Sequence, residues 1–464
     1  MKKTVIFLFF ISIFLLSFFP VKDTDFGWHY RCGKEFLTFS NLCLKNNFSY
    51  FLFDYKSYYP GHFYDIFLTF IYDRFGFIGL SLIGSIIFTL VAFIWLKLLK
   101  TDLWIKITSF YGIFFLSANV FSLGFRSQLI TYLFFLLLLL ILEKSEKNKN
   151  YLFTLPPLFF LWVNSHIGFF IGLIVLGFFV FHHFLRSPLK MKWLLFVFLL
   201  SFFATLMNPF GVNVYQEILN HASSPLNKMI AEWVEPPFWQ SILIIASTLT
   251  GLSAILRQKY KFIFNILLIL FFSFLALKVR RNLPFFYTSF FYIFLNNLSL
   301  KFNFSKKLNE ITVPILTSLI ILVAIIHIPK TIRFDTSWNE YCYKGLSVLP
   351  CQALKKYPQL SGNVYAMYEW GGFLIWQKPK IKIFVDGRMP AWKDENGKSP
   401  YQVFLDIIQT QPGWNEKLNR WKTNYLLITN GTFLDLLLQK EAGKYHWRQM
   451  YRDEVAVVYK NIGR

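Results

Sequence analysis

The chain has 464 residues, of which 55% are hydrophobic and only 16% are charged. A soluble domain of this length carries more charge, so the composition excludes an ordinary soluble protein and indicates a membrane protein. The formal net charge of +23 does not require a nucleic-acid partner, because the cytoplasmic loops of membrane proteins are rich in Lys and Arg.

The chain opens with "MKKTVIFLFFISIFLLSFFP", which has the charged start and apolar run of a signal peptide. No small-residue cleavage site follows this run, and it is nearly long enough to cross a bilayer. We therefore expect an uncleaved first helix whose Lys2–Lys3 end lies in the cytoplasm.

Apolar runs long enough to span a bilayer recur through the first 329 residues, since a spanning helix needs about 20 residues. The shorter stretch 62–72 carries Asp65 and is predicted as an interfacial helix or a short extra span. The expected fold is a multi-pass helical membrane domain at 1–329, with a first external loop at 21–75. Eleven spans are predicted, at 4–20, 76–99, 105–121, 127–142, 151–163, 167–185, 192–207, 241–256, 262–278, 284–298 and 311–328.

Counting spans from a cytoplasmic N-terminus places the basic loops in the cytoplasm, as the positive-inside rule requires. These loops are "KLLKTDLWIK", "EKSEKNKN", "HHFLRSPLKMK", "RQKYK" and "KFNFSKK". The protein is thus expected in the plasma membrane, with everything after about residue 329 outside the cytoplasm. The external turn "KVRRN" breaks the charge rule, which suggests a task such as phosphate binding.

The four cysteines all fall in segments assigned to the outside. Their spacing allows two local disulfides in an oxidising compartment, Cys32–Cys43 and Cys342–Cys351. Four free thiols are the alternative.

Residues 330–464 contain no stretch that could span a membrane, and their pattern predicts an extracytoplasmic α/β domain. Short runs rich in β-branched and aromatic residues predict strands, and amphipathic stretches between them predict helices. The predicted strands are "GNVYA", "KIFVDGR", "NYLLITN" and "EVAVVYKN", and the predicted helices are "YEWGGFLIW", "YQVFLDIIQ" and "TFLDLLLQK".

Polar residues gather at the external ends of separate predicted helices, where they could line one cavity. Ionisable groups at membrane depth are costly, and they are functional candidates for that reason. The candidates are Asp23, Asp25, Trp28, His29, Arg126, Gln128, Asn164, His166, Glu232, Trp233, Arg280 and Arg281.

Each candidate also has a structural explanation. Asp23 and Asp25 could cap a following helix, and the arginines could reach lipid headgroups. His29 could be an interfacial histidine. Asn164 and His166 could serve a break between two helices, and Glu232 could be a solvated loop acid.

Together these residue types suit sugar transfer from a phosphate-linked donor. An acid can take a proton from an acceptor, which is the role expected of Asp25, Asp23 and His29. Arginine offers a planar fork for a phosphate, which is expected of Arg126, Arg280 and Arg281. The remaining candidates are expected to bind substrate, namely Trp28, Gln128, Asn164, His166, Glu232 and Trp233.

Several of these segments resemble the GT-C membrane glycosyltransferases. "DTDFGWHYRCG" is similar to the D-x-D-x-W-W-H-x-x-x-G first-loop motif of a group of bacterial and archaeal multi-pass proteins, with Gly27 where an aromatic residue is usual. "FRSQL", "WVNSHIGFF", "NPFG" and "RRNLPFF" resemble further motifs of that group in the same order, and "YEWGGFLIW" with "KIFVDGR" resembles its carboxyl-terminal domain.

The resemblance implies a polyprenyl-phosphate-linked sugar donor, transfer outside the cytoplasm, and a first-loop acid as base, with Asp25 slightly favoured over Asp23. The acceptor would be a glycan, a lipid or a protein, in contact with membrane lipid and without nucleic acid. Some GT-C enzymes use a divalent metal ion, and "DTD" alone does not decide this point.

Two other functions fit the same sequence. One is a transporter or flippase for a lipid-linked glycan, and the other is a non-catalytic assembly protein. In "VDGR" the residues Asp386 and Arg388 are expected to pair structurally, with acceptor binding or a lid as the alternative. Glu369 and Trp370 are the other conspicuous residues of that domain.

Overall fold

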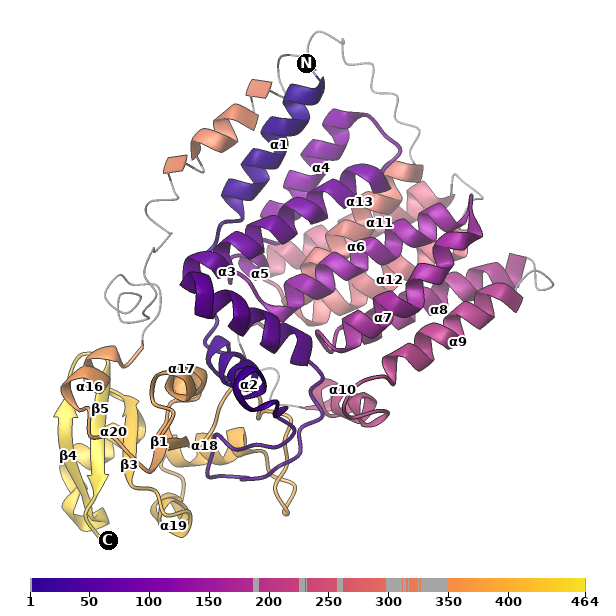
Figure 1. Cartoon of the computed structure of the whole chain (residues 1–464). Helices are drawn as coiled ribbons and strands as arrows, with labels where there is room; N and C mark the ends of the chain where they lie inside the picture. The colour runs from indigo at the N-terminus through magenta and orange to yellow at the C-terminus, as the bar shows by residue number, and fades with distance from the viewer. Residues whose placement is uncertain are drawn as a thin grey trace. The chain divides into compact units, whose positions relative to one another are not determined.

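The computed structural model describes residues 2–186, 192–224, 230, 232–256, 262–297 and 349–463, with parts of 311–326. Its contacts divide the chain into two compact units. The first comprises Met1–Val21, Phe77–Val212 and Lys228–Phe334, and the second comprises Lys22–Gly76, Asn213–Asn227 and Asp335–Arg464. The second unit therefore unites three segments that are far apart in the sequence (Figure 1).

The first unit is a helical bundle. Its helices are apolar on most sides, so each must pack against a neighbour or face an apolar solvent. Helix α7 packs on α9, and α12 packs on α8, α11 and α13 (Figure 1). Its elements are α1 (Lys2–Leu16), α4 (Leu103–Leu116), α5 (Ala118–Phe121), α6 (Ser127–Ser145), η1 (Lys149–Thr154), α7 (Leu155–Val163), α8 (Phe169–Arg186), α9 (Lys192–Thr205), α11 (Phe238–Leu256), α12 (Phe262–Lys278), η4 (Arg280–Asn282) and α13 (Leu283–Asn297).

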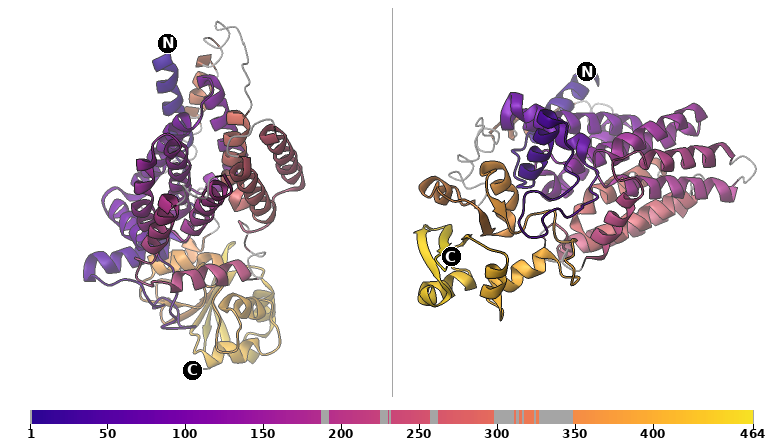
Figure 2. Two further views of the ribbon diagram at one scale, coloured as in Figure 1. Left: turned by 90° about the vertical axis from the view of Figure 1, so that its right-hand side faces the viewer. Right: turned by 60° about the horizontal axis from the view of Figure 1, so that its bottom comes forward.

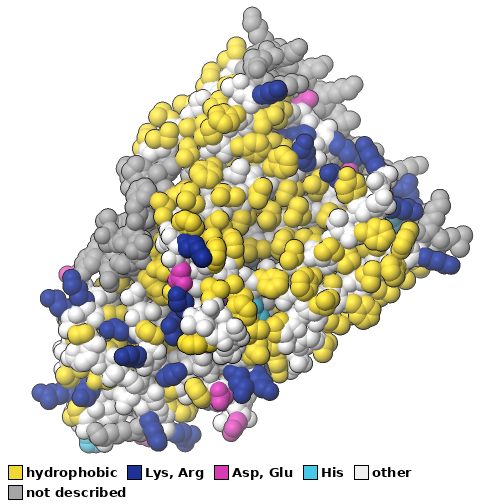
Figure 3. Space-filling model, viewed as in Figure 1, with side chains coloured by type: hydrophobic (Ala, Val, Ile, Leu, Met, Phe, Trp, Pro, Cys, Tyr) yellow, Lys and Arg dark blue, Asp and Glu magenta, His cyan; other side chains and the backbone are white. Residues whose placement is uncertain are grey.

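Helices lie at every predicted span up to 284–298, and the span predicted at 311–328 falls largely outside the described residues. Hydrophobic side chains cover much of the face of this unit in Figure 3, as lipid-facing helices require. The mostly helical architecture with apolar spans is thus confirmed, whereas the count of eleven is not. Four described helices are long and apolar enough to cross a membrane, namely His62–Leu98, Ser127–Ser145, Phe169–Arg186 and Phe238–Leu256.

Helix α3 (His62–Leu98) contains the boundary between the two units. The backbone breaks at Gly76, where φ is 59° and ψ is −155°. Glycine adopts this region without a steric penalty, because it has no Cβ. The stretch predicted as an interfacial helix or short span is the part of α3 before this break.

The second unit holds a mixed sheet (Figure 2). Its five strands lie in the order β2-β1-β3-β5-β4. Strand β1 pairs in parallel with β2 and β3, while β5 runs antiparallel to β3 and β4. Its elements are α2 (Phe26–Phe39), α10 (Asn213–Ser223), α16 (Cys351–Lys356), β1 (Asn363–Ala366), η5 (Tyr368–Trp370), α17 (Gly371–Gln377), β2 (Lys382–Ile383), α18 (Pro400–Ile408), α19 (Trp414–Arg420), β3 (Tyr425–Thr429), α20 (Phe433–Glu441), η6 (Gly443–Tyr445), β4 (Trp447–Arg452) and β5 (Ala456–Asn461).

The four strands and three helices predicted for this domain are all present. Strand β4 was not predicted, because "WRQMYR" is polar and lacks a clear alternation. Only Trp447 of this edge strand is fully buried, while the three residues after it are exposed.

The loop predicted to be the first external one belongs to the same unit as the sheet. Ser49 forms a parallel bridge with Ile383 of β2, and the amide of Tyr50 donates to the Ile383 carbonyl over 3.0 Å. Phe51 lies in the core of the sheet domain, with its ring centroid 4.9 Å from that of Phe384. The loop therefore extends both the sheet and its hydrophobic core.

The predicted disulfide Cys32–Cys43 is formed, with the two Cα atoms 5.4 Å apart. It ties α2 to the loop that reaches the sheet. Cys351 is also disulfide-bonded, whereas Cys342, its predicted partner, lies outside the described residues.

Helices α2 and α17 cross at very short range. A Cβ atom on Gly27 would lie 1.8 Å from the carbonyl oxygen of Gly372, and a Cβ atom on Gly372 would lie 2.0 Å from the carbonyl oxygen of Thr24. Real side chains do not tolerate such distances. The glycine at position 27, which departs from the aromatic residue of the resembled motif, thus allows backbone to pack on backbone.

We predict that Gly27→Ala destabilises the second unit by about 1–3 kcal/mol, as overpacking does elsewhere. The clash is with backbone, so a side-chain rotation cannot relieve it. Thermal unfolding of the full chain in detergent measures the effect. Gly443→Ala is the control, because a Cβ atom there meets nothing within 4 Å. Equal melting temperatures for the two variants would contradict the close crossing.

Candidate functional site

The first-loop acids stand at the start of α2. The Oδ1 atom of Asp23 accepts a hydrogen bond from the Asp25 amide over 3.0 Å, which forms a tight turn. Asp25 occupies the N-cap position of α2, yet its side chain makes no capping hydrogen bond. Capping therefore does not explain the Asp25 carboxylate.

The turn after β2 lies against this carboxylate within the second unit. A Cβ atom on Gly387 would come within 2.1 Å of Asp25 Oδ1. On either side of that glycine, Arg388 Nε and Nη2 donate to Asp386 Oδ1 and Oδ2 over 2.8 and 2.6 Å. The fully buried Asp386 thus forms the structural pair expected from "VDGR". Trp370 is buried and Glu369 is exposed.

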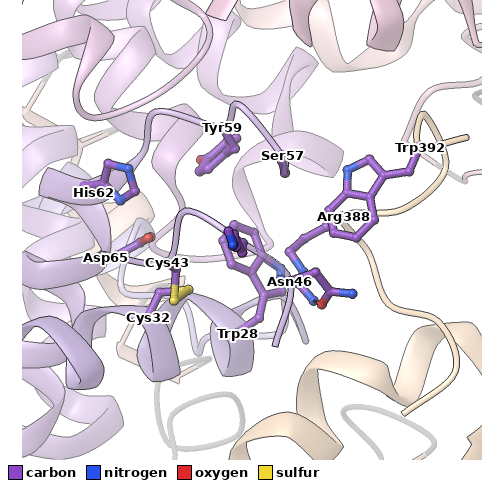
Figure 4. Close-up of a pocket in the computed structure, with 11 residues that line it drawn as sticks. Trp28, Cys32, Cys43, Asn46, Ser57, Tyr59, His62, Asp65, Arg388 and Trp392 are labelled. Atoms are coloured by element: carbon purple, nitrogen blue, oxygen red, sulfur yellow. Dashed lines mark hydrogen bonds between the residues drawn. A yellow bond between two sulfur atoms is a disulfide. The ribbon is translucent and has the colours of Figure 1, made fainter. Parts of the chain in front are cut away.

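His29 and Trp28 lie on α2 among aromatic rings. The Trp28 and His29 ring centroids are 3.5 Å apart, and His29 Nδ1 is 2.5 Å from Asp65 Oδ1. Both partners of this contact are buried, so Asp65 fixes the orientation of the imidazole. Figure 4 shows Asp65 and Trp28 among the residues of one pocket.

Asp65 was not predicted as a site residue, although an ionisable group in an apolar stretch was the signal for it. Arg388, which lines the same pocket, was singled out in "VDGR" mainly as a structural partner of Asp386, and Trp392 had no comparable signal. Their place depends on how the carboxyl-terminal sheet domain folds against the first loop, and no local pattern specifies that.

A basic cluster forms in the first unit, where three loops predicted to lie together meet. Arg126 Nη1 donates to both carboxylate oxygens of Glu232 over 2.8 Å. The Arg281 guanidinium lies 5.2 Å from the centre of a Trp233 ring, and the Arg280 amide donates to the Val234 carbonyl over 3.0 Å. The segments "FRSQL", "AEWVEPP" and "KVRRN" thus meet, while the single cavity predicted for all the candidate residues stays a prediction.

The arginines set the electrostatics of this basic cluster. Burial alone would raise the pKa of Glu232, but the positive charges of Arg126 and Arg281 outweigh it and hold that pKa below the usual range. Burial lowers the pKa of His166 well below its usual value, and the charges of Arg281 and Arg126 lower it further. Glu232 is therefore ionised at neutral pH, and His166 is neutral.

The tautomer of the neutral His166 ring follows from its partners. The Gly168 amide donates to His166 Nδ1 over 3.1 Å, so that nitrogen carries no proton. Thr131 Oγ1 lies 2.8 Å from the same nitrogen and accepts from Trp162 Nε1 over 2.9 Å. His166 Nε2 thus bears the proton and remains a donor.

The other two candidates lie near helix ends of the first unit. Asn164 Nδ2 donates to the carbonyl oxygens of Phe160 and Met207 over 2.9 Å each, which is what a helix break requires. Gln128 is partly exposed in the first turn of α6. Their predicted roles in substrate binding stay predictions.

A divalent metal was left open by the sequence. Within the residues that the structure describes, no three or more His, Cys, Asp or Glu side chains are grouped so that they could hold a metal ion. Asp23 and Asp25 alone do not provide such a set.

Comparison with known proteins identifies the fold. No protein-family model and no curated protein matches the chain. Among solved structures, the archaeal oligosaccharyltransferase AglB from Archaeoglobus fulgidus, in complex with an inhibitory peptide and a dolichol-phosphate, matches with a TM-score of 0.61 and 12% identity. The match covers 99% of this chain and 74% of that one.

The chain has an oligosaccharyltransferase fold. Two further structures of the Archaeoglobus fulgidus enzyme agree, one tethered to an acceptor peptide containing the NVT sequon and one in complex with Zn and sulfate, with TM-scores of 0.56 and 0.57. Each is 12% identical and covers at least 98% of this chain, with 74% and 73% of the other chain matched. The resemblance to GT-C membrane glycosyltransferases is thus confirmed at the level of the fold.

We predict that Glu232→Gln destabilises the first unit by about 1–2 kcal/mol at neutral pH, because it removes the charge that pairs with the mostly buried Arg126. The Glu232 pKa is lowered in the folded protein. The contribution of the ionised Glu232 to the free energy of unfolding is therefore complete above the ordinary glutamate pKa. It is lost as the pH falls through the lowered pKa of the folded protein.

Thermal unfolding of the unaltered protein and of Glu232→Gln, measured from acid to neutral pH, tests the prediction. Glu441→Gln is the matched control, because the Lys444–Glu441 pair is exposed and such pairs contribute little. A melting difference that is the same at acid and neutral pH would contradict the assigned charge.

Proposed function

We propose that the protein is a membrane glycosyltransferase that moves a sugar from a polyprenyl-phosphate-linked donor to a glycan, lipid or protein acceptor. The observation that carries the proposal is the fold match over 99% of the chain to an oligosaccharyltransferase in complex with a dolichol-phosphate. The residues that resemble GT-C motifs lie in both units of the chain. This distribution agrees with a structural match that covers 99% of the chain.

In the proposed reaction the acceptor oxygen or nitrogen bonds to the anomeric carbon as the bond from that carbon to the phosphate oxygen breaks. The Asp25 carboxylate, or that of Asp23, takes the proton of the acceptor. The polyprenyl phosphate leaves with the bonding electron pair, and arginines stabilise its growing negative charge. His29, which Asp65 holds in place, orients the acceptor next to the Asp25 or Asp23 carboxylate.

The basic cluster supports the phosphate half of this proposal. Within the described residues, the loops that carry Arg126, Arg280 and Arg281 meet at Glu232 and Trp233. Glu235 of the same loop lies 3.9 Å from Lys278 Nζ. The Glu232 carboxylate accepts both bonds from a single Nη1 of Arg126, so it orients the guanidinium. Arginine binds phosphate through paired N–H groups, and the Arg281 guanidinium lies 5.2 Å from the Trp233 ring centre.

The proposed location is the plasma membrane, with a cytoplasmic N-terminus and transfer on the extracytoplasmic side. The disulfides at Cys32 and Cys351 support an oxidising compartment for the second unit. The distribution of Lys and Arg among the predicted loops supports the same orientation. Whether a divalent metal ion takes part belongs to the proposal and is tested by chelation.

We predict that Asp23→Asn combined with Asp25→Asn lowers sugar transfer at least about 100-fold, the scale of general base catalysis. The assay is transfer from a polyprenyl-phosphate-linked sugar by purified protein, with membrane insertion checked in parallel. Asp54→Asn is the matched control. Asp54 lies exposed in the same loop with φ at 63°, a conformation that asparagine tolerates.

Unchanged transfer in the double variant would reject the acid as the base. If the protein instead moves the lipid-linked glycan across a bilayer without transferring it, the transporter is correct and the enzyme is not. Metal dependence is read from the same assay with and without a chelator.

We predict that a reporter enzyme active only outside the cytoplasm is active when it is fused after Arg464, and inactive when it is fused within the predicted cytoplasmic loop 143–150. The reason is that the Lys- and Arg-rich loops are expected to stay in the cytoplasm, which places the carboxyl terminus outside. Activity with the reverse pattern would overturn the orientation and with it the proposed side of transfer.

A further inference from the structure

The turn between α7 and α8 holds the His166 ring by one of its two nitrogens. The Gly168 amide donates to His166 Nδ1 over 3.1 Å, and Thr131 Oγ1 lies 2.8 Å from the same atom. Because Trp162 Nε1 donates to that oxygen over 2.9 Å, the threonine hydroxyl keeps its own proton for Nδ1. Nδ1 is therefore an acceptor, and the ring proton lies on Nε2, at the other side of the ring.

The groups that hold this ring are themselves fixed by packing. Trp162 is fully buried and Thr131 is nearly so. A Cβ atom on Gly168 would lie 2.6 Å from Thr131 Oγ1 and 2.9 Å from His166 Nδ1, so a larger residue there would displace both groups. Turning Nδ1 away would leave the buried Thr131 hydroxyl unpaired, which is unfavourable. The direction of the Nε2–H bond is thus set before any ligand arrives.

The outward nitrogen of His166 is open to a partner. Within the described part of the chain, both hydrogen bonds of the ring are made by Nδ1. His166 is 7% exposed, and its Nε2 is not one of the enclosed unpaired polar atoms of the described residues. This N–H group therefore reaches the surface, where it can donate to a molecule that binds there.

Two guanidinium groups of the basic cluster act on this imidazole. Burial is the main cause of the lowered His166 pKa, and the charges of Arg281 and Arg126 add to it. Both charges are therefore close enough to affect the ring. Arg126 is the N-cap residue of α6, and Thr131 follows about 7.5 Å further along that helix. The neutral N–H donor thus stands beside cations, where an anion is the favoured acceptor.

A phosphate diester suits donors that come from separate elements. Its two non-bridging oxygens point in different directions, so a histidine in one turn and an arginine in another can each bind one. A planar carboxylate instead presents both oxygens to one guanidinium. The basic cluster already contains that second case, because Glu232 directs both of its oxygens to Arg126.

We propose that His166 Nε2 donates a hydrogen bond to a non-bridging phosphate oxygen of the lipid-linked donor, while arginines of the basic cluster balance its charge. The inference rests on the proposed function, since it assigns a further binding residue to the same donor site. Thr131 is a positioning residue in this account, because it acts through His166. The imidazole orients the phosphate without adding a charge.

The test is equilibrium binding of the methyl diester of polyprenyl phosphate to the full chain in phosphatidylcholine nanodiscs. In His166→Gln the side-chain amide reaches the place of Nε2, whereas in His166→Asn it reaches only the place of Nδ1. Glutamine is expected to keep the affinity within about threefold, and asparagine to weaken it at least about tenfold, the scale of a charged hydrogen bond. Equal affinities of the two variants would overturn the proposal.

His183→Gln is the matched control, because it makes the same change at the other end of α8 and should leave binding unaltered. Thermal unfolding of the two His166 variants separates binding from folding. A loss of binding in His166→Asn that is matched by a lower melting temperature than that of His166→Gln would assign the residue a structural role and overturn the proposal.

The pH profile of the unaltered chain tests the neutral donor without any variant. The methyl diester keeps one negative charge throughout, Arg126 and Arg281 stay charged, and Glu232 stays ionised near neutral pH. Binding is therefore expected to stay constant through the ordinary pKa range of histidine. Binding that strengthens about tenfold as the pH falls through that range would identify His166 as a cation and overturn the neutral donor.

An ordinary phospholipid could offer the same phosphate chemistry, so phosphatidylglycerol is added as a competitor. It is a diester with the same single charge. Little competition at equal concentration is expected if the site binds the lipid-linked donor. Full competition would assign His166 to membrane headgroups and overturn its assignment to the donor.

Binding and transfer separate this inference from the proposed function. Diester binding that depends on His166, in a protein without transfer activity, would support the inference and reject the enzyme. Sugar transfer that is unaltered in His166→Asn would reject the inference alone.

Discussion

The second unit depends on one contact in which backbone packs directly on backbone. Gly27 on α2 and Gly372 on α17 leave no room for a single Cβ atom between them, and Gly387 does the same beside the Asp25 carboxylate. Because these three positions lack side chains, the first loop and the carboxyl-terminal sheet domain form one body. The pocket at Trp28 and Trp392 is lined by residues of both segments.

A second constraint is that charges in an apolar protein must be paired when they are buried. Arg126 with Glu232 and Arg388 with Asp386 both satisfy it, and His29 with Asp65 is a buried hydrogen-bonded pair. These pairs hold side chains in fixed orientations next to the proposed sites. Because burying an unpaired charge is costly, an apolar chain of this composition holds few buried ionisable residues. Each of them is therefore a candidate for a function.

Much of the fold could be predicted from the sequence, because apolar periodicity and β-branched runs are local signals. Helices stand where apolar runs were found, and the strands of "GNVYA" and "NYLLITN" are present. The polar edge strand β4 was missed, since it has no such signal. The number of membrane-crossing helices was also beyond the sequence, because several apolar helices are too short to settle it.

In the candidate site, too, features with a local sequence signal could be predicted and features that depend on distant segments could not. The basic cluster could be predicted, because arginines in turns that are predicted to be external conflict with the charge rule and therefore stand out. The contact of "VDGR" with Asp25, and the pocket that Trp392 lines, could not be predicted, because they depend on segments more than 300 residues apart (Asp25 and Gly387). Gly27, which departs from the resembled motif, is explained only by the packing of α17.

The central claim is that the basic cluster binds the phosphate of a lipid-linked donor. Equilibrium binding of polyprenyl phosphate to the full chain in nanodiscs, compared among the unaltered protein, Arg281→Gln and Lys278→Gln, tests it most directly. The account predicts that Arg281→Gln weakens binding at least about tenfold, the scale of a charged hydrogen bond, while the exposed Lys278 matters little. Equal binding by all three proteins would contradict it.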